Sequence, residues 1–216
     1  MVFLYIYIMS EKQRVIFYVD GFNFYFGLKD KKWKNFYWLD MIKFCSAFVK
    51  PHQELIEVNY FSAIPKDDGK HERQDLFFSA NIQQEKFKLH LGKYLSKNKK
   101  CNSCGAKYKI HEEKETDVRI AIQMVKDVVQ DKCDISILIS ADSDLVPPIE
   151  FIREFNPKHK IITYFPPNRY SSNLNQLSNN TVKLDGCFIQ FENSILPEEI
   201  ILKETGYKIK RPDKWK

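Results

Sequence analysis

The stretch that decides the fold is Val15-Ile16-Phe17-Tyr18-Val19-Asp20-Gly21-Phe22-Asn23, in which an apolar run stops at an aspartate. A short continuous apolar run predicts a strand buried on both faces, as in parallel sheets. A second stretch, Ile135-Ser136-Ile137-Leu138-Ile139-Ser140-Ala141-Asp142-Ser143-Asp144, has the same form. Carboxylates that directly follow such strands lie at the carboxyl edge of the sheet, where open α/β folds bind their ligands.

The rest of the chain predicts alternating strands and helices. The expected strands cover 14–20, 55–64, 88–95, 135–140, 160–165 and 181–184, and the expected helices cover 39–49, 73–87, 117–129, a segment ending at 155, and 171–178. Short links between alternating elements predict a three-layer α/β sandwich with a mainly parallel central sheet, which is a Rossmann-like arrangement. We therefore expect one domain over 14–195, a leader over 1–13, and a charged C-terminal tail over 196–216 that forms an arm or a frayed end.

Composition restricts the function only weakly. The chain of 216 residues carries 34 Lys and Arg against 28 Asp and Glu, a net charge of +6 that is compatible with a polyanionic partner but does not select one. Five cysteines without a regular framework, and no export signal, favour a reducing, cytoplasmic setting. Residues 1–8 are apolar but too short to cross a bilayer, so no membrane association is expected. They are either translated from a start upstream of the true one, which we favour, or an extra edge strand.

Four carboxylates are candidates for a metal site. Asp20, Asp142 and Asp144 follow predicted strands, and Asp117 opens the long helix after Thr116, its expected N-cap. All four converge at one sheet edge if the two strands are neighbours. Grouped carboxylates repel one another, and Mg²⁺ or Mn²⁺, which take oxygen ligands, would relieve that repulsion. Each aspartate alone is more simply a turn or helix-start residue, whereas the four together favour the metal site.

Several polar and aromatic residues lie beside these acids. Asn23, Ser140 and Ser143 are placed to orient a water or a phosphate oxygen, or else serve as turn and cap residues. The aromatic run over 22–26 is expected to form core or pocket wall.

The same motifs resemble those of a known family. Val19–Asn23 resembles the opening motif of NYN domains, a branch of the PIN-like ribonucleases. The later motifs are similar to the segments 112–121 (with Lys114, Asp117 and Val118), 137–145, and 164–167 followed by Arg169, so that the resemblance runs from about Val15 to Asp185.

The resemblance implies a PIN-like fold and an endoribonuclease that uses Mg²⁺ or Mn²⁺ to hydrolyse phosphodiester bonds of single-stranded or structured RNA. Its acidic, metal-binding site would consist of Asp20, Asp117, Asp142 and Asp144. Lys114 and Arg169 would offset phosphate charge. The alternative is a catalytically weak or inactive module of the same fold that binds RNA or another protein.

A second constellation lies in a Cys- and Lys-rich insertion at 96–111. The sequence Cys101-Asn102-Ser103-Cys104-Gly105 is half of a zinc knuckle, and structural zinc needs four ligands. His90 and His111 are the nearest candidates to complete a Cys₂His₂ site. The alternatives are a loop with free thiols, or a zinc ion or disulfide shared between copies of a homo-oligomer. The lysines here, with Tyr94 and Tyr108, suit single-stranded nucleic acid or form a solvated loop.

Other phosphate enzymes fit less well. The D-x-D form of Asp142 and Asp144 occurs in nucleotide-sugar transferases but leaves Asp20 and Asp117 without a role. An aspartyl-phosphate phosphatase needs a second aspartate where Phe22 stands. The glycine-rich turn of dinucleotide-binding folds is absent after the first strand.

Overall fold

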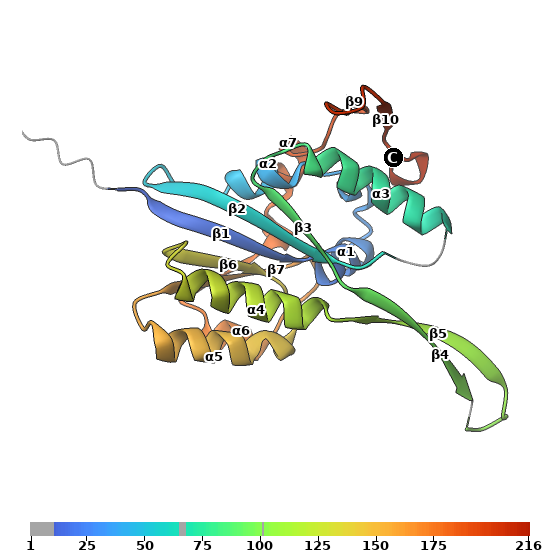
Figure 1. The fold of residues 1–216 in the computed structure, drawn as a ribbon, viewed down its shortest axis with the longest axis horizontal. Coiled ribbons are helices and arrows are strands. Elements are labelled where there is room, and N and C mark those ends of the chain that lie inside the picture. The colour runs from blue at the N-terminus through green and yellow to red at the C-terminus, as the bar shows by residue number, and fades with distance from the viewer. Residues whose placement is uncertain (1–10, 65–67, 101) are drawn as a thin grey trace, which may run out of the picture.

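The computed structural model describes residues 11–64, 68–100 and 102–216, and its centre is a six-stranded sheet (Figure 1). The strand order is β3-β2-β1-β6-β7-β8, and every neighbouring pair is parallel. The strands are β1 (Gln13–Asp20), β2 (Gln53–Ser62), β3 (Phe87–Leu91), β6 (Ile135–Ile139), β7 (Lys160–Phe165) and β8 (Asn180–Lys183). The predicted parallel sheet is confirmed, with β1 beginning one residue before the expected domain boundary.

The order of the strands reverses between β1 and β6. From β1 the chain builds β2 and β3 on one side, and it then returns to place β6 on the other side, with Val15 opposite Ile135 and Val19 opposite Ile139. Such a switch point is where open α/β sheets bind ligands, because the connections leave in opposite directions and open a crevice at the carboxyl edge. The residues that follow β1 and β6 therefore meet at this edge.

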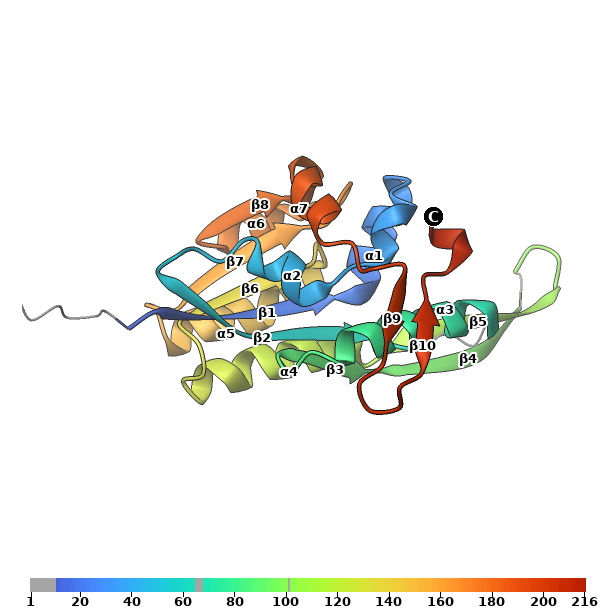
Figure 2. The same ribbon diagram turned by 90° about the horizontal axis from the view of Figure 1, so that it is seen from above.

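Helices cover both faces of the sheet, so the sandwich has three layers (Figure 2). One face carries α1 (Gly21–Asp30), α2 (Met41–Ser46), α3 (Asp68–Ile82) and α7 (Phe188–Asn193), and the other carries α4 (Thr116–Val129), α5 (Val146–Phe155) and α6 (Ser172–Leu177). Successive residues of β1 enter opposite cores: Phe17 packs in the first and Tyr18 in the second. This explains why the strand is a continuous apolar run. None of the described helices is long and apolar enough to cross a membrane.

The Lys-rich insertion is a β-hairpin rather than a loop. Its strands, β4 (Lys93–Lys100) and β5 (Lys107–Lys114), pair antiparallel, with Lys93 opposite Lys114 at the base. The predicted strand over 88–95 is thus two strands separated at Gly92, whose N–H donates to the Ser62 carbonyl (2.7 Å). The hairpin projects from the body beyond the carboxyl edge of the sheet (Figure 1).

The C-terminal tail packs on the body, so the prediction of an arm or frayed end is wrong. It forms the hairpin of β9 (Glu199–Ile201) and β10 (Lys208–Lys210) and the turn η4 (Asp213–Trp215). Ile209 is 3% exposed, and the indole N–H of Trp38 donates to the Pro197 carbonyl (2.9 Å). The predicted leader lies almost entirely outside the described residues, which begin at 11.

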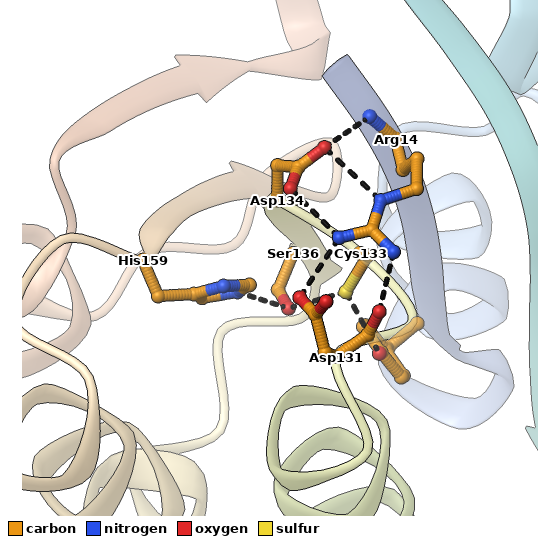
Figure 3. A network of polar contacts seen from close by, with 7 residues as sticks. Arg14, Asp131, Cys133, Asp134, Ser136 and His159 are labelled. Carbon is orange, nitrogen blue, oxygen red and sulfur yellow. Dashed lines mark hydrogen bonds and ion pairs between the residues drawn. The ribbon is translucent and has the colours of Figure 1, made fainter. Parts of the chain in front are cut away.

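A polar network fixes the amino edge of the sheet, opposite the switch point (Figure 3). The Arg14 guanidinium donates to both Asp134 oxygens (2.9 and 3.3 Å) and to Asp131 (2.8 Å). The bonds from Arg14 hold the pKa of Asp134 below its usual value. Nearby, Ser136 is hydrogen-bonded to the buried His159 ring (2.9 Å), whose pKa is lowered by burial. These contacts tie β1 to β6 and β7.

Candidate metal centre

Three of the four predicted carboxylates meet at the switch point. One oxygen each of Asp20, Asp117 and Asp142 lie within 4.8 Å of one another. They come from the end of β1, the first turn of α4 and the loop after β6, so three segments distant in the sequence build the group. Asp20 is only 3% exposed, while the other two are partly buried.

Asp20 is held rigidly by its neighbours. One of its oxygens accepts a hydrogen bond from the backbone N–H of Asn23 (3.0 Å), so Asp20 caps α1. Its other oxygen accepts from the Ser140 hydroxyl (2.8 Å). Helix α1 starts directly after Asp20 because Gly21 has no side chain: a Cβ there would lie 2.5 Å from the Phe61 carbonyl oxygen.

Asn23 and Ser140 connect the two strand ends. The Ser140 oxygen also accepts from the backbone N–H of Asp142 (3.0 Å), and the Asn23 side-chain oxygen accepts from the N–H of Ala141 (3.2 Å). Both residues were expected to orient a water or phosphate, and the contacts they make in the structure position the carboxylates themselves.

Asp144 lies outside the group of three. It is exposed in the turn η2 (Ser143–Leu145), where its N–H donates to the Asp142 carboxylate (3.0 Å), and Ser143 is exposed beside it. Its predicted part in the chemistry stays a prediction.

The start of α4 is set by Glu115 rather than by Thr116 as expected. Glu115 occupies the N-cap position with a left-handed backbone (φ 78°), and its carboxylate binds Lys93 and Arg119, each at 3.0 Å. These bonds, that from Lys93 first, lower the pKa of Glu115. Lys114 is exposed at the end of β5, directly before Glu115. Because the helix begins after Glu115, Asp117 lies in its first turn.

Arg169 is not brought to the carboxylates. Its guanidinium donates to Asp30 at the last residue of α1 (2.5 Å). Asp30 lies about 15 Å along the helix from Asp20, at a rise of about 1.5 Å per residue. The structure therefore gives Arg169 a structural ion pair.

The predicted zinc site is not assembled around His90. That side chain is hydrogen-bonded to Asn59 (2.6 Å) and stacks on Phe61, with ring centroids 4.5 Å apart. Cys104 is exposed in the turn beyond the far end of β4, roughly 25 Å away at about 3.3 Å per residue. Cys101 and the side chain of His111 lie outside the described residues. The expectation that His90 completes a site with Cys104 is wrong, because His90 lies in β3 before the base of the hairpin and Cys104 lies in the turn at its far end.

A cavity of about 320 Å³ lies next to the acidic group and was not predicted as a site. Its lining comes from α1, the turn η1 (Lys34–Tyr37), the ends of β2 and α3, the base of the hairpin and the C-terminal turn. The lining is largely aromatic and includes Phe22, Phe24, Tyr25, Phe26, Phe36, Tyr37, Tyr60, Phe77, Tyr94 and Trp215. The cavity adjoins the acidic group because Gly21 and Phe22, which directly follow Asp20, line it. Burial first, and then the Asp20 charge, raise the pKa of Tyr60 in the cavity wall. The signal in the sequence was the aromatic run over 22–26, which was expected to form core or pocket wall.

Comparison with known proteins supports the fold and the family. The chain is 26% identical over 182 residues to 6-hydroxy-3-succinoylpyridine 3-monooxygenase HspA of Pseudomonas putida (strain DSM 28022 / S16). This match covers 67% of this chain and 57% of the relative's length. A protein of unknown function from Vibrio parahaemolyticus RIMD 2210633, known from its crystal structure, has the same fold, with a TM-score of 0.56 at 20% identity over 82% of this chain and 96% of its own. The family model of the NYN domain matches residues 14–185, and the chain therefore belongs to the NYN domain family.

Proposed function

We propose that the protein is an endoribonuclease that depends on Mg²⁺ or Mn²⁺ and hydrolyses phosphodiester bonds of RNA. The observation that carries the proposal is the approach of Asp20, Asp117 and Asp142 to within 4.8 Å at the switch point of an NYN chain. The family is nuclease-like, and the acidic group stands where the fold binds ligands.

The donor set fits a hard divalent cation. Three carboxylates offer only oxygen ligands, which Mg²⁺ and Mn²⁺ prefer. The carboxylates repel one another when no cation lies between them. Ser140 and Asn23 hold these carboxylates in place, because they form hydrogen bonds to Asp20 and to the backbone of residues 141 and 142. A divalent ion at such a site lowers the pKa of a water and offsets charge on a phosphodiester.

The basic hairpin supports RNA as the substrate. It leaves the body at the edge that carries the carboxylates, and five of its lysines are exposed: Lys93, Lys99, Lys100, Lys107 and Lys114. Lysines on an extended arm contact phosphates without reading sequence. Lys114, three residues before Asp117, would bind the phosphate next to the cleaved bond. Asp144, on the exposed side, would orient water or substrate.

The test is cleavage of an end-labelled single-stranded RNA by the purified protein in Mn²⁺, in Mg²⁺ and in EDTA. Metal-dependent cutting that is lost in Asp142→Asn supports the proposal. The matched control is Asp131→Asn, the same change at the opposite edge of the sheet. Cutting that survives in Asp142→Asn, or that persists in EDTA, would contradict it. RNA binding without cutting in any metal would favour the alternative of an RNA-binding module.

The similarity to HspA suggests a second candidate, oxidation of an aromatic N-heterocycle. The aromatic cavity beside Asp20 is the observation in its favour. We place it second because a monooxygenase draws electrons from a carrier such as a flavin or nicotinamide, and the glycine-rich turn that binds such carriers is absent after β1. Oxygen uptake with a hydroxypyridine and reduced nicotinamide would reverse this order.

A further inference from the structure

The aromatic cavity opens beside the acidic group. Gly21 and Phe22, which directly follow Asp20, form part of its lining. At the base of the hairpin, Tyr94 also lines it, and its ring lies 5.9 Å from that of Phe22. A strand of RNA that lies along the hairpin and reaches the carboxylates therefore passes close to Tyr94 and Phe22, which line the cavity.

The opposite wall is supplied by the C-terminal segment, beyond the part of the chain that matches the family. Trp215 lines the cavity and contacts Tyr37, with ring centroids 5.8 Å apart, and Tyr37 in turn contacts Tyr25 at 4.9 Å. The turn that carries Trp215 is fixed because Arg211 donates to the Trp215 carbonyl (2.8 Å). The cavity is thus completed by residues outside the family match, which ends at 185.

Among the residues that the structure describes, the charged ones in the lining are all cationic. Lys29, Lys70 and Arg73 line the cavity together with Gln74, whose amide donates to the Ser62 hydroxyl (2.8 Å), and the described lining includes no aspartate or glutamate. Aromatic walls with cations among them suit a flat, electron-rich ring that is attached to an anion. The volume lies at the lower end of the roughly 300–1,000 Å³ that is usual for ligand pockets.

We propose that this cavity receives one unstacked nucleobase of a single-stranded RNA, next to the phosphodiester that is cleaved. The inference takes its substrate class from the proposed function. Tyr25, 37% exposed, offers a stacking surface at the mouth, and Lys29, Lys70 and Arg73 contact the flanking phosphates. Because a base can enter only when it is unstacked, the cavity selects single-stranded over duplex RNA.

The first experiment measures tryptophan fluorescence in EDTA, where binding is observed without cutting. The chain has three tryptophans, of which only Trp215 lines the cavity, while Trp38 is fully buried. We expect a short single-stranded RNA to quench the fluorescence, and Trp215→Phe to abolish the quenching. A perfect duplex of the same sequence should leave it unchanged. Equal quenching by the duplex would overturn the inference.

The second experiment measures RNA affinity in EDTA by fluorescence anisotropy. Tyr25→Ala should weaken binding roughly 5- to 150-fold, the range for the loss of one base–aromatic stack. Tyr207→Ala is the matched control, because Tyr207 is 68% exposed in the C-terminal segment and does not line the cavity. A wild-type protein that binds an abasic RNA of the same length as tightly as the intact RNA would also overturn the inference.

The two proposals fail in different ways. If the protein cuts RNA with a metal and Tyr25→Ala binds RNA as tightly as the wild type, the proposal of a base-binding cavity is wrong and the nuclease proposal is supported. Quenching that depends on the base, without cutting in any metal, would keep the cavity and remove the nuclease.

Discussion

The hydroxyl of Ser140 donates to the Asp20 carboxylate at 2.8 Å and also accepts the backbone N–H of Asp142 at 3.0 Å. One side chain at the end of β6 therefore fixes the carboxylate that ends β1 and the backbone that carries the second carboxylate.

Ser140→Ala should reduce both stability and metal affinity. The change removes a donor from the buried Asp20 and leaves the Asp142 N–H without this acceptor, at a cost of about 1–3 kcal/mol. Urea unfolding and calorimetric Mn²⁺ titration measure the two effects. Ser143→Ala, an equal truncation at an exposed position nearby, should change neither.

Asp142→Asn should stabilise the metal-free protein and remove its response to Mn²⁺. The neutral amide relieves repulsion from Asp20 and Asp117, and its oxygen can still accept from the Asp144 N–H. We expect thermal melts in EDTA to give a higher Tm than for the wild type, and Mn²⁺ to raise the Tm of the wild type alone. A lower Tm in EDTA would show that the carboxylates do not repel one another appreciably.

Removing three hairpin charges should weaken RNA binding and its dependence on salt. Lys99, Lys100 and Lys107, all changed to Gln, should lower the slope of log affinity against log salt by about 2, since each phosphate contact on a single strand contributes about 0.7. The matched control changes Lys12, Lys158 and Lys160 at the amino edge of the sheet. Equal losses in both triple variants would indicate a net-charge effect instead.

Gly21→Ala should destabilise the protein and disturb the acidic group. The added Cβ would approach the Phe61 carbonyl oxygen to 2.5 Å, and overpacking of this kind costs about 1–3 kcal/mol. The N-terminus of α1 must shift, which moves the Asp20 cap. Gly186→Ala is the control, because nothing lies within 4 Å of a Cβ there. Chemical denaturation of both variants checks the prediction.

Stability should fall as the pH drops below about 6.5. Burial lowers the pKa of His159 and of His90 from the ordinary value of 6.5, so the unfolded chain binds protons more readily than the folded one. The resulting stabilisation is complete above pH 6.5 and declines as the pH falls toward the folded-state pKa values. Melts at pH 7.5 and 5.5 should therefore show a smaller loss for His159→Gln than for the wild type. An equal loss would assign the pH dependence to other groups.

The sheet and the carboxylates could be predicted because burial leaves a pattern in the sequence. Asp20 and Asp142 end runs of apolar residues, and α4 shows helical spacing, so Asp117 could be placed at its start. The two lysine-rich strands could not be recognised, since neither has a continuous apolar run.

Other features depend on long-range contacts that no local pattern encodes. The tail reads as polar, yet Ile209 and Trp215 anchor it on the body. In the same way, Arg169 matched a motif position, but its partner Asp30 is distant in the sequence. His90 was assigned by proximity in sequence to Cys104, and only the three-dimensional structure shows that Asn59 is its partner.

The basic hairpin leaves and rejoins the body at one point, where Lys93 faces Lys114 and Glu115 binds Lys93. An element attached in this way can change in length or charge while the sheet and its carboxylates keep their geometry. Under the proposed function, the strength of RNA binding and the chemistry at the carboxylates can therefore evolve separately. An engineer could lengthen or recharge the arm to change its affinity for a polyanion and leave the acidic group as it is.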